Sequence, residues 1–146
     1  MNWLIDTNVI SELRKPKPAV VVINWLSELS IGKAFTSTMN IAELIYGANS
    51  VRDFLKKREL EQWVEAVVRP WFLGRIIEID EDVLVRWRML ARQQDLARQP
   101  TPSPDLIIAA VAQKYRLAIA TRDTAPFVVC GIPTFNPWTG ERFNGA

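Results

Sequence analysis

Short apolar runs that alternate with helical segments constrain the fold of this chain more than any other feature. The apolar runs predict strands over residues 3–5, 34–37, 75–79, 117–120 and 132–135. Between these runs, apolar residues recur at helical spacing. Alternation of this kind indicates an α/β domain, with a mostly parallel central sheet of four to five strands covered by helices.

The intervening patterns predict helices over residues 9–14, 19–29, 38–47, 51–68, 80–97 and 104–115. Pro18 suits the first turn of the second helix, and Asp80 is a suitable N-cap for the fifth. Gly47 and Pro70 mark helix ends, and a loop with three prolines (99–104) leads into the last helix. The chain has no internal repeat, and its 146 residues fit one domain with a single core, so residues 1–146 are expected to form one domain.

The amino-acid composition narrows the chemistry. The chain has no histidine and one cysteine, Cys130, which excludes histidine-dependent triads, histidine-ligated zinc, an internal disulfide and multi-cysteine metal sites. A metal held by this chain would have oxygen ligands, which suit Mg²⁺ or Mn²⁺. Cys130 is expected to be an inert small hydrophobe. The net charge of +2 permits a polyanionic partner without requiring one.

The sequence also predicts where the protein resides. No apolar run approaches the ~20 residues that a membrane-spanning helix needs. The opening residues Met-Asn-Trp-Leu-Ile-Asp lack the basic start and the apolar stretch of a secretory signal peptide. We therefore expect a cytoplasmic protein with no membrane partner.

Two acidic residues follow predicted strands. Asp6 and Asp123 stand at the carboxyl ends of the first and fourth strands, the edge at which open α/β sheets bind their ligands. Each also has a purely structural interpretation, because Asp6 could cap the next helix and Asp123 could be a turn residue. For Asp6 the structural and functional roles can hold together.

Two further acids lie on predicted helices. Glu43 occupies a segment that is apolar almost all round, so its helix is expected to be well buried, and a lone buried carboxylate is costly unless it is paired, protonated or bound to metal. Asp105 follows Ser103, which alone would suit an ordinary helix start. Ala109 and Ala112 on the same helix would let it approach the sheet closely and bring Asp105 toward the strand ends.

Several carboxylates that converge on one edge repel each other unless cations hold them together. The four acids therefore predict a site for Mg²⁺ or Mn²⁺, formed by Asp6, Glu43, Asp105 and Asp123. These ions assist in-line displacement at phosphoryl groups. The residues thus point to chemistry at a phosphoryl group, in which a metal-activated water attacks.

Four segments resemble, in order, the motifs of the PIN domain family. They are residues 4–11 around Asp6, 41–47 around Glu43, 105–110 beginning with Asp105, and 120–123 ending at Asp123 and followed by Phe127. The closing Phe-Asn-Pro-Trp at residues 135–138 resembles the VapC and FitB branch of the family. The match covers nearly the whole chain, and four motifs in order are far more specific than any one alone.

The resemblance implies a PIN-like three-layer fold and a Mg²⁺- or Mn²⁺-dependent endoribonuclease that is the toxin of a toxin–antitoxin pair. It assigns the metal site to the four acids and makes Asn8 and Thr121 polar residues that support the site. It also implies a homodimer, or a higher hetero-oligomer with an antitoxin whose C-terminal segment covers the active site. The proline-rich approach at residues 100–104 bears only on the loop geometry before Asp105.

Basic and aromatic residues add weaker signals. A basic run at residues 56–58 is interpreted first as a solvated helix face paired with Glu59 and Glu61, and only second as an RNA contact. Better candidates for RNA contacts are the arginines that flank the loop before Asp105: Arg86, Arg88, Arg92 and Arg98. The tryptophans in helical patterns are expected in the core or in an interface: Trp25, Trp63, Trp71 and Trp87.

Two other functions compete with the ribonuclease. A phosphatase would use Asp6 as a covalent nucleophile, but that chemistry normally needs a second aspartate two residues later, where this chain has Asn8. A non-catalytic partner in an antitoxin–repressor complex would not need all four acids. Incubation of single-stranded RNA with and without EDTA discriminates these functions.

Overall fold

The central sheet of the computed structural model, which describes residues 1–94 and 103–146, has six strands in the order β3-β2-β1-β4-β5-β6. The strands are β1 (Trp3–Ile5), β2 (Ala34–Ser37), β3 (Ile76–Ile77), β4 (Ala118–Ala120), β5 (Thr134–Phe135) and β6 (Arg142–Phe143). All neighbouring pairs are parallel except β5 and β6. β1 lies at the centre, with Leu4 opposite Phe35 of β2 and Ile119 of β4.

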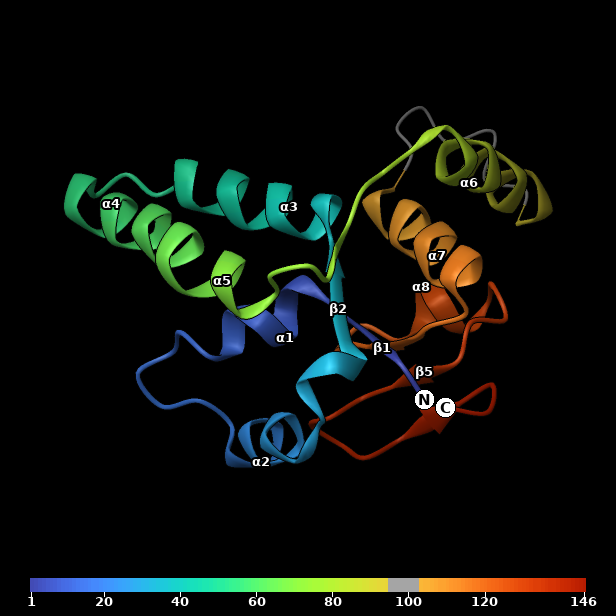
Figure 1. Cartoon of the computed structure of the whole chain (residues 1–146), viewed down its shortest axis with the longest axis horizontal. Coiled ribbons are helices and arrows are strands. Elements are labelled where there is room, and N and C mark those ends of the chain that lie inside the picture. Colours follow the sequence, from blue (N-terminus) through green and yellow to red (C-terminus); the bar gives the residue numbers. More distant parts are fainter. Residues whose placement is uncertain (95–102) are drawn as a thin grey trace.

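Helices cover both faces of the sheet (Figure 1). They are α1 (Thr7–Glu12), α2 (Val20–Glu28), the short η1 (Ile31–Lys33), α3 (Thr38–Asn49), α4 (Phe54–Trp63), η2 (Val64–Val68), α5 (Arg69–Trp71), α6 (Glu81–Gln93), α7 (Pro104–Tyr115) and α8 (Ala125–Val128). In Figure 1, α3, α4 and α5 lie on one side of β1 and β2, and α6, α7 and α8 lie on the other.

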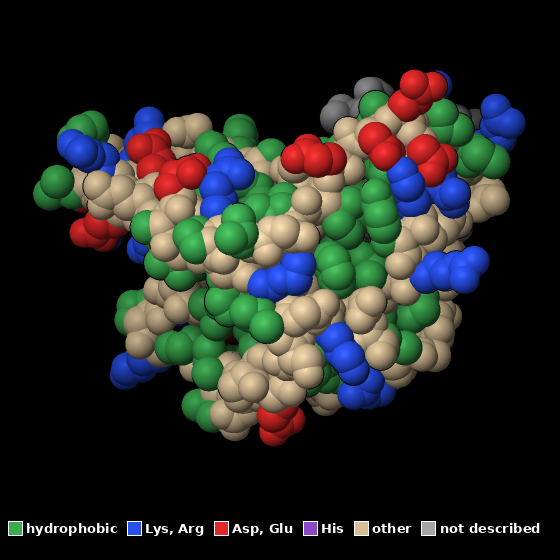
Figure 2. All heavy atoms as spheres, in the orientation of Figure 1, with side chains coloured by type: hydrophobic (Ala, Val, Ile, Leu, Met, Phe, Trp, Pro, Cys, Tyr) green, Lys and Arg blue, Asp and Glu red, His purple; other side chains and the backbone are tan. Residues whose placement is uncertain are grey.

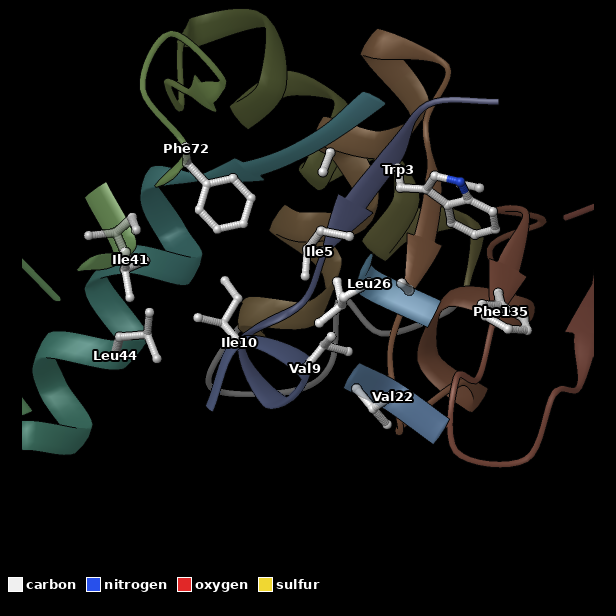
Figure 3. Close-up of a cluster of buried hydrophobic side chains, with 14 of the residues drawn as sticks. Trp3, Ile5, Val9, Ile10, Val22, Leu26, Ile41, Leu44, Phe72 and Phe135 are labelled. Carbon is white, nitrogen blue, oxygen red and sulfur yellow. The ribbon is translucent and has the colours of Figure 1, made fainter. Parts of the chain in front are cut away.

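The alternation of side chains along the strands divides the interior into two hydrophobic cores, one on each face. Trp3 and Ile5 of β1 enter the first core, which α1, α2 and α3 cover, whereas Leu4 enters the second, which α6, α7 and α8 cover. Figure 3 shows the first core, in which Ile10 and Phe72 lie among the buried aliphatic side chains. The result is a three-layer arrangement with the sheet in the middle.

The predicted α/β class and the predicted three-layer fold are confirmed. The sheet has one strand more than the four to five predicted, because β6 adds to β5 in the antiparallel sense. β6 is only two residues long and begins with an exposed arginine, so its sequence carries no strand pattern. The short helix α8 was not predicted either.

Near the N-terminus two helix boundaries differ from the prediction. α1 begins at Thr7 and ends at Glu12, earlier than the predicted 9–14, because Asp6 caps it by accepting a hydrogen bond from the Thr7 N–H. Pro18 does not lie in the first turn of α2. Ala19 is the N-cap of that helix, and its N–H is bound by the Glu12 carboxylate at 2.9 Å.

Gly47 and Pro70 do not end their helices. α3 continues past Gly47 to Asn49, because Leu44 and Ala48 are buried on either side of it and tertiary packing outweighs the low helix propensity of glycine. The predicted helix 51–68 begins only at Phe54, capped by Asp53, and widens into a π-helical turn at η2. Pro70 lies inside α5 directly after that wider turn, where its ring and missing N–H are tolerated.

In the middle of the chain, β3 is shorter than the predicted 75–79 because only Ile76 and Ile77 find partners before β2 ends. Asp80 caps α6 as predicted, but the helix stops at Gln93, short of the predicted end at residue 97. Residues 95–102 lie outside the described residues, and so do Arg98 and most of the proline-rich loop. α7 has the predicted bounds 104–115.

No helix in the two described ranges is long and apolar enough to cross a membrane.

Candidate active site

Asp6 stands where the central strand β1 ends and α1 begins. Its N–H donates to the carbonyl of Ala120 on β4 at 3.0 Å, which continues the sheet pairing to the last residue before the helix. Its carboxylate caps α1 through the Thr7 N–H at 2.8 Å. The residue is 5% exposed, so the fold places a carboxylate in the interior at the carboxyl edge of the sheet.

Thr121 and Asn8 bind Asp6 to the end of β4. The Thr121 hydroxyl donates to Oδ2 of Asp6 at 2.6 Å and accepts from Nδ2 of Asn8 at 3.1 Å and from the Asp123 N–H at 3.2 Å. Oδ1 of Asn8 accepts from the Arg122 N–H at 3.2 Å. The polar residues predicted to support the site are thus brought into one network with Asp6.

Asn40 holds the other side of the Asp6 carboxylate and was not predicted. It is fully buried on α3, and its Nδ2 donates to Oδ1 of Asp6 at 3.1 Å and to the Thr7 hydroxyl at 3.2 Å. Its Oδ1 accepts from the N–H and hydroxyl of Ser37 in a capping box. The available sequence signal was a lone amide in an otherwise apolar segment three residues after Ser37.

Glu43 lies one turn after Asn40 on α3, and its Oε2 accepts a hydrogen bond from the Thr7 hydroxyl. The prediction that this helix is well buried is wrong for one part of its surface: Ala42, Tyr46 and Gly47 are exposed, and Glu43 itself is half-buried. The reason is that α3 packs against β2 and against the helices α1, α4, η2 and α7, and the part of its surface that none of these elements covers is open to solvent. Glu43 therefore stands at the border between core and solvent, where it can reach a ligand.

Asp105 lies in the first turn of α7, as predicted. Its N–H donates to Oγ of Ser103 at 3.2 Å, and that hydroxyl donates to Oδ2 of Asp105 at 3.3 Å. Ala109 and Ala112 are buried in the second core, which also contains Leu4 of β1 and Ile119 of β4. Asp123 follows β4 and is exposed.

All four predicted acids line one open cavity of about 450 Å³ at the carboxyl edge of the sheet. The other lining residues are Thr7, Asn8, Ser11, Glu12, Lys15, Arg122 and Trp138. Sequence reasoning did not assign a role to most of these, because they come from α1 and from the segments after β4 and β5 and only the fold brings them together.

Burial and neighbouring carboxylates raise the pKa values of three of the four acids in the cavity. Burial raises the pKa of Asp6 to about 6, against the lowering effect of hydrogen bonds from Thr121 and Thr7, and the charges of Glu43 and Asp105 add to the rise. Burial also raises the pKa of Glu43 and of Asp105. The charge of Asp105 adds to the effect on Glu43, and that of Asp123 adds to the effect on Asp105.

This set of donors fits a hard divalent cation, since carboxylate and hydroxyl oxygens face a shared cavity and the acids disfavour each other's ionised forms. In the part of the chain that the structure describes, however, no three Asp, Glu, His or Cys side chains are already gathered closely enough to hold a metal ion. The fit of these residues to a divalent cation therefore rests on the chemistry of their oxygen atoms and on the cavity that they share.

The predictions about the basic residues have mixed outcomes. Figure 2 shows Lys and Arg mixed with Asp and Glu over α4 and α6, which favours the solvated-face interpretation of residues 56–58. The ion pairs predicted with Glu59 and Glu61 do not form among the described salt bridges, and Arg58 instead stacks on Phe54. Arg86 pairs with Asp82 at 3.2 Å.

The tryptophans are partly buried against the cores, as predicted: Trp25, Trp63 and Trp71 pack on the first and Trp87 on the second. Cys130 packs against the second core, and burial raises the pKa of its thiol, which favours the unreactive protonated form.

Comparisons with known proteins agree with this geometry. A family model described as the PIN domain matches residues 3–130. The curated protein "Toxin FitB" of Neisseria gonorrhoeae is 35% identical over 135 residues, which is 92% of this chain and 97% of FitB. "VapC ribonuclease Y4jK" of Sinorhizobium fredii is 32% identical over 135 residues, which is 92% of this chain and 96% of that protein.

Among solved structures, the crystal structure of FitAcB from Neisseria gonorrhoeae has a TM-score of 0.84 and 34% identity, and the match covers 93% of this chain and 98% of that one. These relatives match nearly end to end, and the family model spans most of the chain. The resemblance inferred from the four acidic motifs is thus confirmed, and the chain belongs to the PIN domain family.

Proposed function

We propose that this protein is a metal-dependent endoribonuclease that hydrolyses phosphodiester bonds of RNA and is the toxin of a toxin–antitoxin pair. The observation that carries the proposal is the set of four carboxylates on one cavity, of which three have pKa values raised by burial and by one another. The names of the relatives, a ribonuclease and a toxin, point to the same activity.

In this proposal Asp6, Glu43, Asp105 and Asp123 hold Mg²⁺ or Mn²⁺. When bound, the cation would neutralise the acids and the phosphate and lower the pKa of water to make it a nucleophile. The chain's own contribution is to orient the ligands: Thr121 and Asn40 hold the two oxygens of Asp6, and Thr7 holds Glu43. Because water is the nucleophile, the products should carry 5′-phosphate and 3′-hydroxyl ends.

The test is cleavage of single-stranded RNA by the purified protein in EDTA, followed by addition of excess Mg²⁺ or Mn²⁺. We expect no cleavage in EDTA, restored cleavage with metal, and 5′-phosphate ends on the fragments. Cleavage that persists in EDTA, or fragments with 2′,3′-cyclic phosphate ends, would contradict the proposed chemistry. A protein that stays inactive with both metals would support the competing hypothesis of a non-catalytic partner in a repressor complex.

The proposal includes partners and location. A toxin of this kind would be inhibited by an antitoxin whose segment covers the acid cavity, would form a homodimer or a larger assembly with that antitoxin, and would meet its RNA in the cytoplasm. A phosphatase with Asp6 as nucleophile is disfavoured, because Asn8, at the position of the expected second acid, uses its amide to bind Thr121 and Arg122.

A further inference from the structure

Arg122 is a residue of the acid cavity to which the proposed function assigns no role. It follows Thr121 at the end of β4 and lines the same cavity as the four acids, together with Trp138. A cavity with four carboxylates repels RNA, which carries one negative charge at each phosphate. A positive group at its border would attract the strand and hold it beside the acids.

The backbone of Arg122 is held from both sides. Its N–H donates to Oδ1 of Asn8 at 3.2 Å, and its carbonyl accepts from Nδ2 of the buried Asn136 at 3.4 Å. These two contacts determine where the side chain leaves the backbone. They also connect the end of β4 to α1 and to the segment after β5.

The side chain is stacked on an aromatic ring. The guanidinium carbon of Arg122 lies 5.3 Å from the ring centroid of Trp138, within the range of a cation–π contact. Trp138 is half-buried and packs against the first core, so the ring is itself held in place. Stacking of this kind leaves the N–H groups at the edge of the guanidinium available for an oxyanion.

The guanidinium of Arg122 forms no ion pair with any described carboxylate, whereas Lys15 in the same cavity is paired with Glu12 at 2.7 Å. The charge of Arg122 does act on the cavity, since it helps the hydrogen bonds from Lys15 and Ala19 to keep the pKa of Glu12 low. Arg122 is thus an unpaired, stacked cation beside a set of acids.

We infer that Arg122, braced on Trp138, binds a backbone phosphate of the RNA strand next to the acid cavity. The inference rests on the proposed action on RNA and adds to it the residue that positions the strand. A guanidinium offers two parallel N–H groups to a phosphate, so the contact sets the register of the strand as well as its affinity.

The test compares Arg122→Ala with Arg142→Ala. Arg142 is an exposed arginine on β6 whose guanidinium lies 4.5 Å from the centroid of Phe135, so its removal deletes an equal charge and an equivalent stacked contact away from the cavity. In steady-state cleavage of single-stranded RNA, Arg122→Ala should raise KM about tenfold with little change in kcat. Arg142→Ala should match the wild type.

Binding is measured separately, by the anisotropy of a fluorescein-labelled single-stranded RNA with protein that carries Asp105→Asn. Arg122→Ala should weaken Kd about tenfold and reduce the slope of log Kd against log salt by about 0.7, the value of one phosphate contact on a single strand. Arg122→Lys should keep the salt slope but bind more weakly, because a point charge lacks the planar fork. Trp138→Phe should keep most of the affinity, and Trp138→Leu should lose it several-fold.

The inference is overturned if Arg122→Ala and Arg142→Ala change Kd and salt slope equally, or if Arg122→Ala lowers only the melting temperature, which would mean that Arg122 merely packs on Trp138. It fails separately from the proposed function. A wild-type protein that binds RNA but never cleaves it would contradict the nuclease, while the salt slope would still decide the role of Arg122.

Discussion

The Thr121 hydroxyl donates a hydrogen bond of 2.6 Å to Oδ2 of Asp6 and so joins the carboxyl ends of β4 and β1 at the acid cavity. The same oxygen accepts from Asn8 and from the Asp123 N–H, so its one proton and both lone pairs are used. A single hydroxyl therefore links the Asp6 carboxylate to the backbone of Asp123.

Thr121→Val, which keeps the shape and removes the hydroxyl, should destabilise the protein by about 1–3 kcal/mol and lower kcat for RNA cleavage. The cause is that two N–H donors lose their acceptor and Asp6 loses a donor. Urea unfolding and cleavage rates measure the two effects, and Thr121→Ser should restore both. The matched control is Thr134→Val, which removes a buried hydroxyl whose one hydrogen bond among the described residues is to the Ile132 carbonyl. If that variant loses as much activity, the effect is general destabilisation.

Asp6→Asn and Asp105→Asn should each reduce RNA cleavage by more than about a hundredfold, because loss of a direct ligand should cost at least as much as loss of a residue that orients one. Circular dichroism should show that both variants keep the fold. Asp82→Asn, which alters an exposed acid on α6, serves as the control and should cleave like the wild type. Wild-type cleavage by a folded Asp6→Asn or Asp105→Asn variant would remove that acid from the metal site.

Mg²⁺ or Mn²⁺ should raise the melting temperature, because the ion binds the assembled acids and not the unfolded chain. At a concentration one hundred times its Kd the ion would add about 2.7 kcal/mol. Glu43→Gln should stabilise the metal-free protein at neutral pH, since it removes one of the repelling charges, and should reduce the response to metal. Glu59→Gln on the exposed face of α4 is the control. A melting curve that ignores millimolar metal would argue against the site.

The stability of the metal-free protein should fall as the pH rises from about 4 to about 7. The pKa of Asp6 rises from its ordinary 3.8 to about 6 on folding, so the native state holds this proton more tightly, and the stabilising contribution is present below pH 3.8 and lost as the pH passes 6. At about 1.4 kcal/mol per pKa unit, the effect is at most about 3 kcal/mol. Glu43 and Asp105 act in the same direction.

Urea unfolding in EDTA across this pH range measures the slope. Asp6→Asn should make the free energy of unfolding depend less on pH, because it removes the carboxyl group whose pKa rises from 3.8 to about 6 on folding. Glu12 has the opposite sign, since contacts with Lys15 and Ala19 lower its pKa, and its contribution is lost only at acid pH. If the stability instead increases steadily between pH 4 and 7 in the absence of metal, burial does not raise the pKa values of the cavity acids.

A basic peptide from an antitoxin should inhibit cleavage by placing an arginine among the four carboxylates. An arginine pairs with two carboxylates in fork geometry and would compete with the metal for the same oxygens. Inhibition should therefore weaken at high Mg²⁺ or Mn²⁺, and an Arg→Ala change in the peptide should release activity more than it weakens binding. Inhibition that responds to neither change would place the partner elsewhere, for example across the entry path of the RNA.

The sequence by itself was sufficient for the local features. Asp80 and Ser103 cap helices whose first turns follow them directly, and β1 and β4 are apolar runs that end at a polar residue. Because the carboxyl ends of parallel strands meet at one edge, the strand-end positions of Asp6 and Asp123 were enough to predict a shared site. The order of the four acidic motifs was enough to predict the family.

Only the tertiary structure decided which polar side chains hold the acids and where the helices end. Asn40, Thr7 and Arg122 acquire their roles from contacts between segments far apart in the chain, and no local pattern marks such contacts. The continuation of α3 past Gly47 has the same cause, since burial of its neighbours stabilises the helix more than the glycine destabilises it. Spacing and propensity act over a few residues, whereas burial and hydrogen bonding act between whichever residues the fold brings together, and those interactions shape the acid cavity.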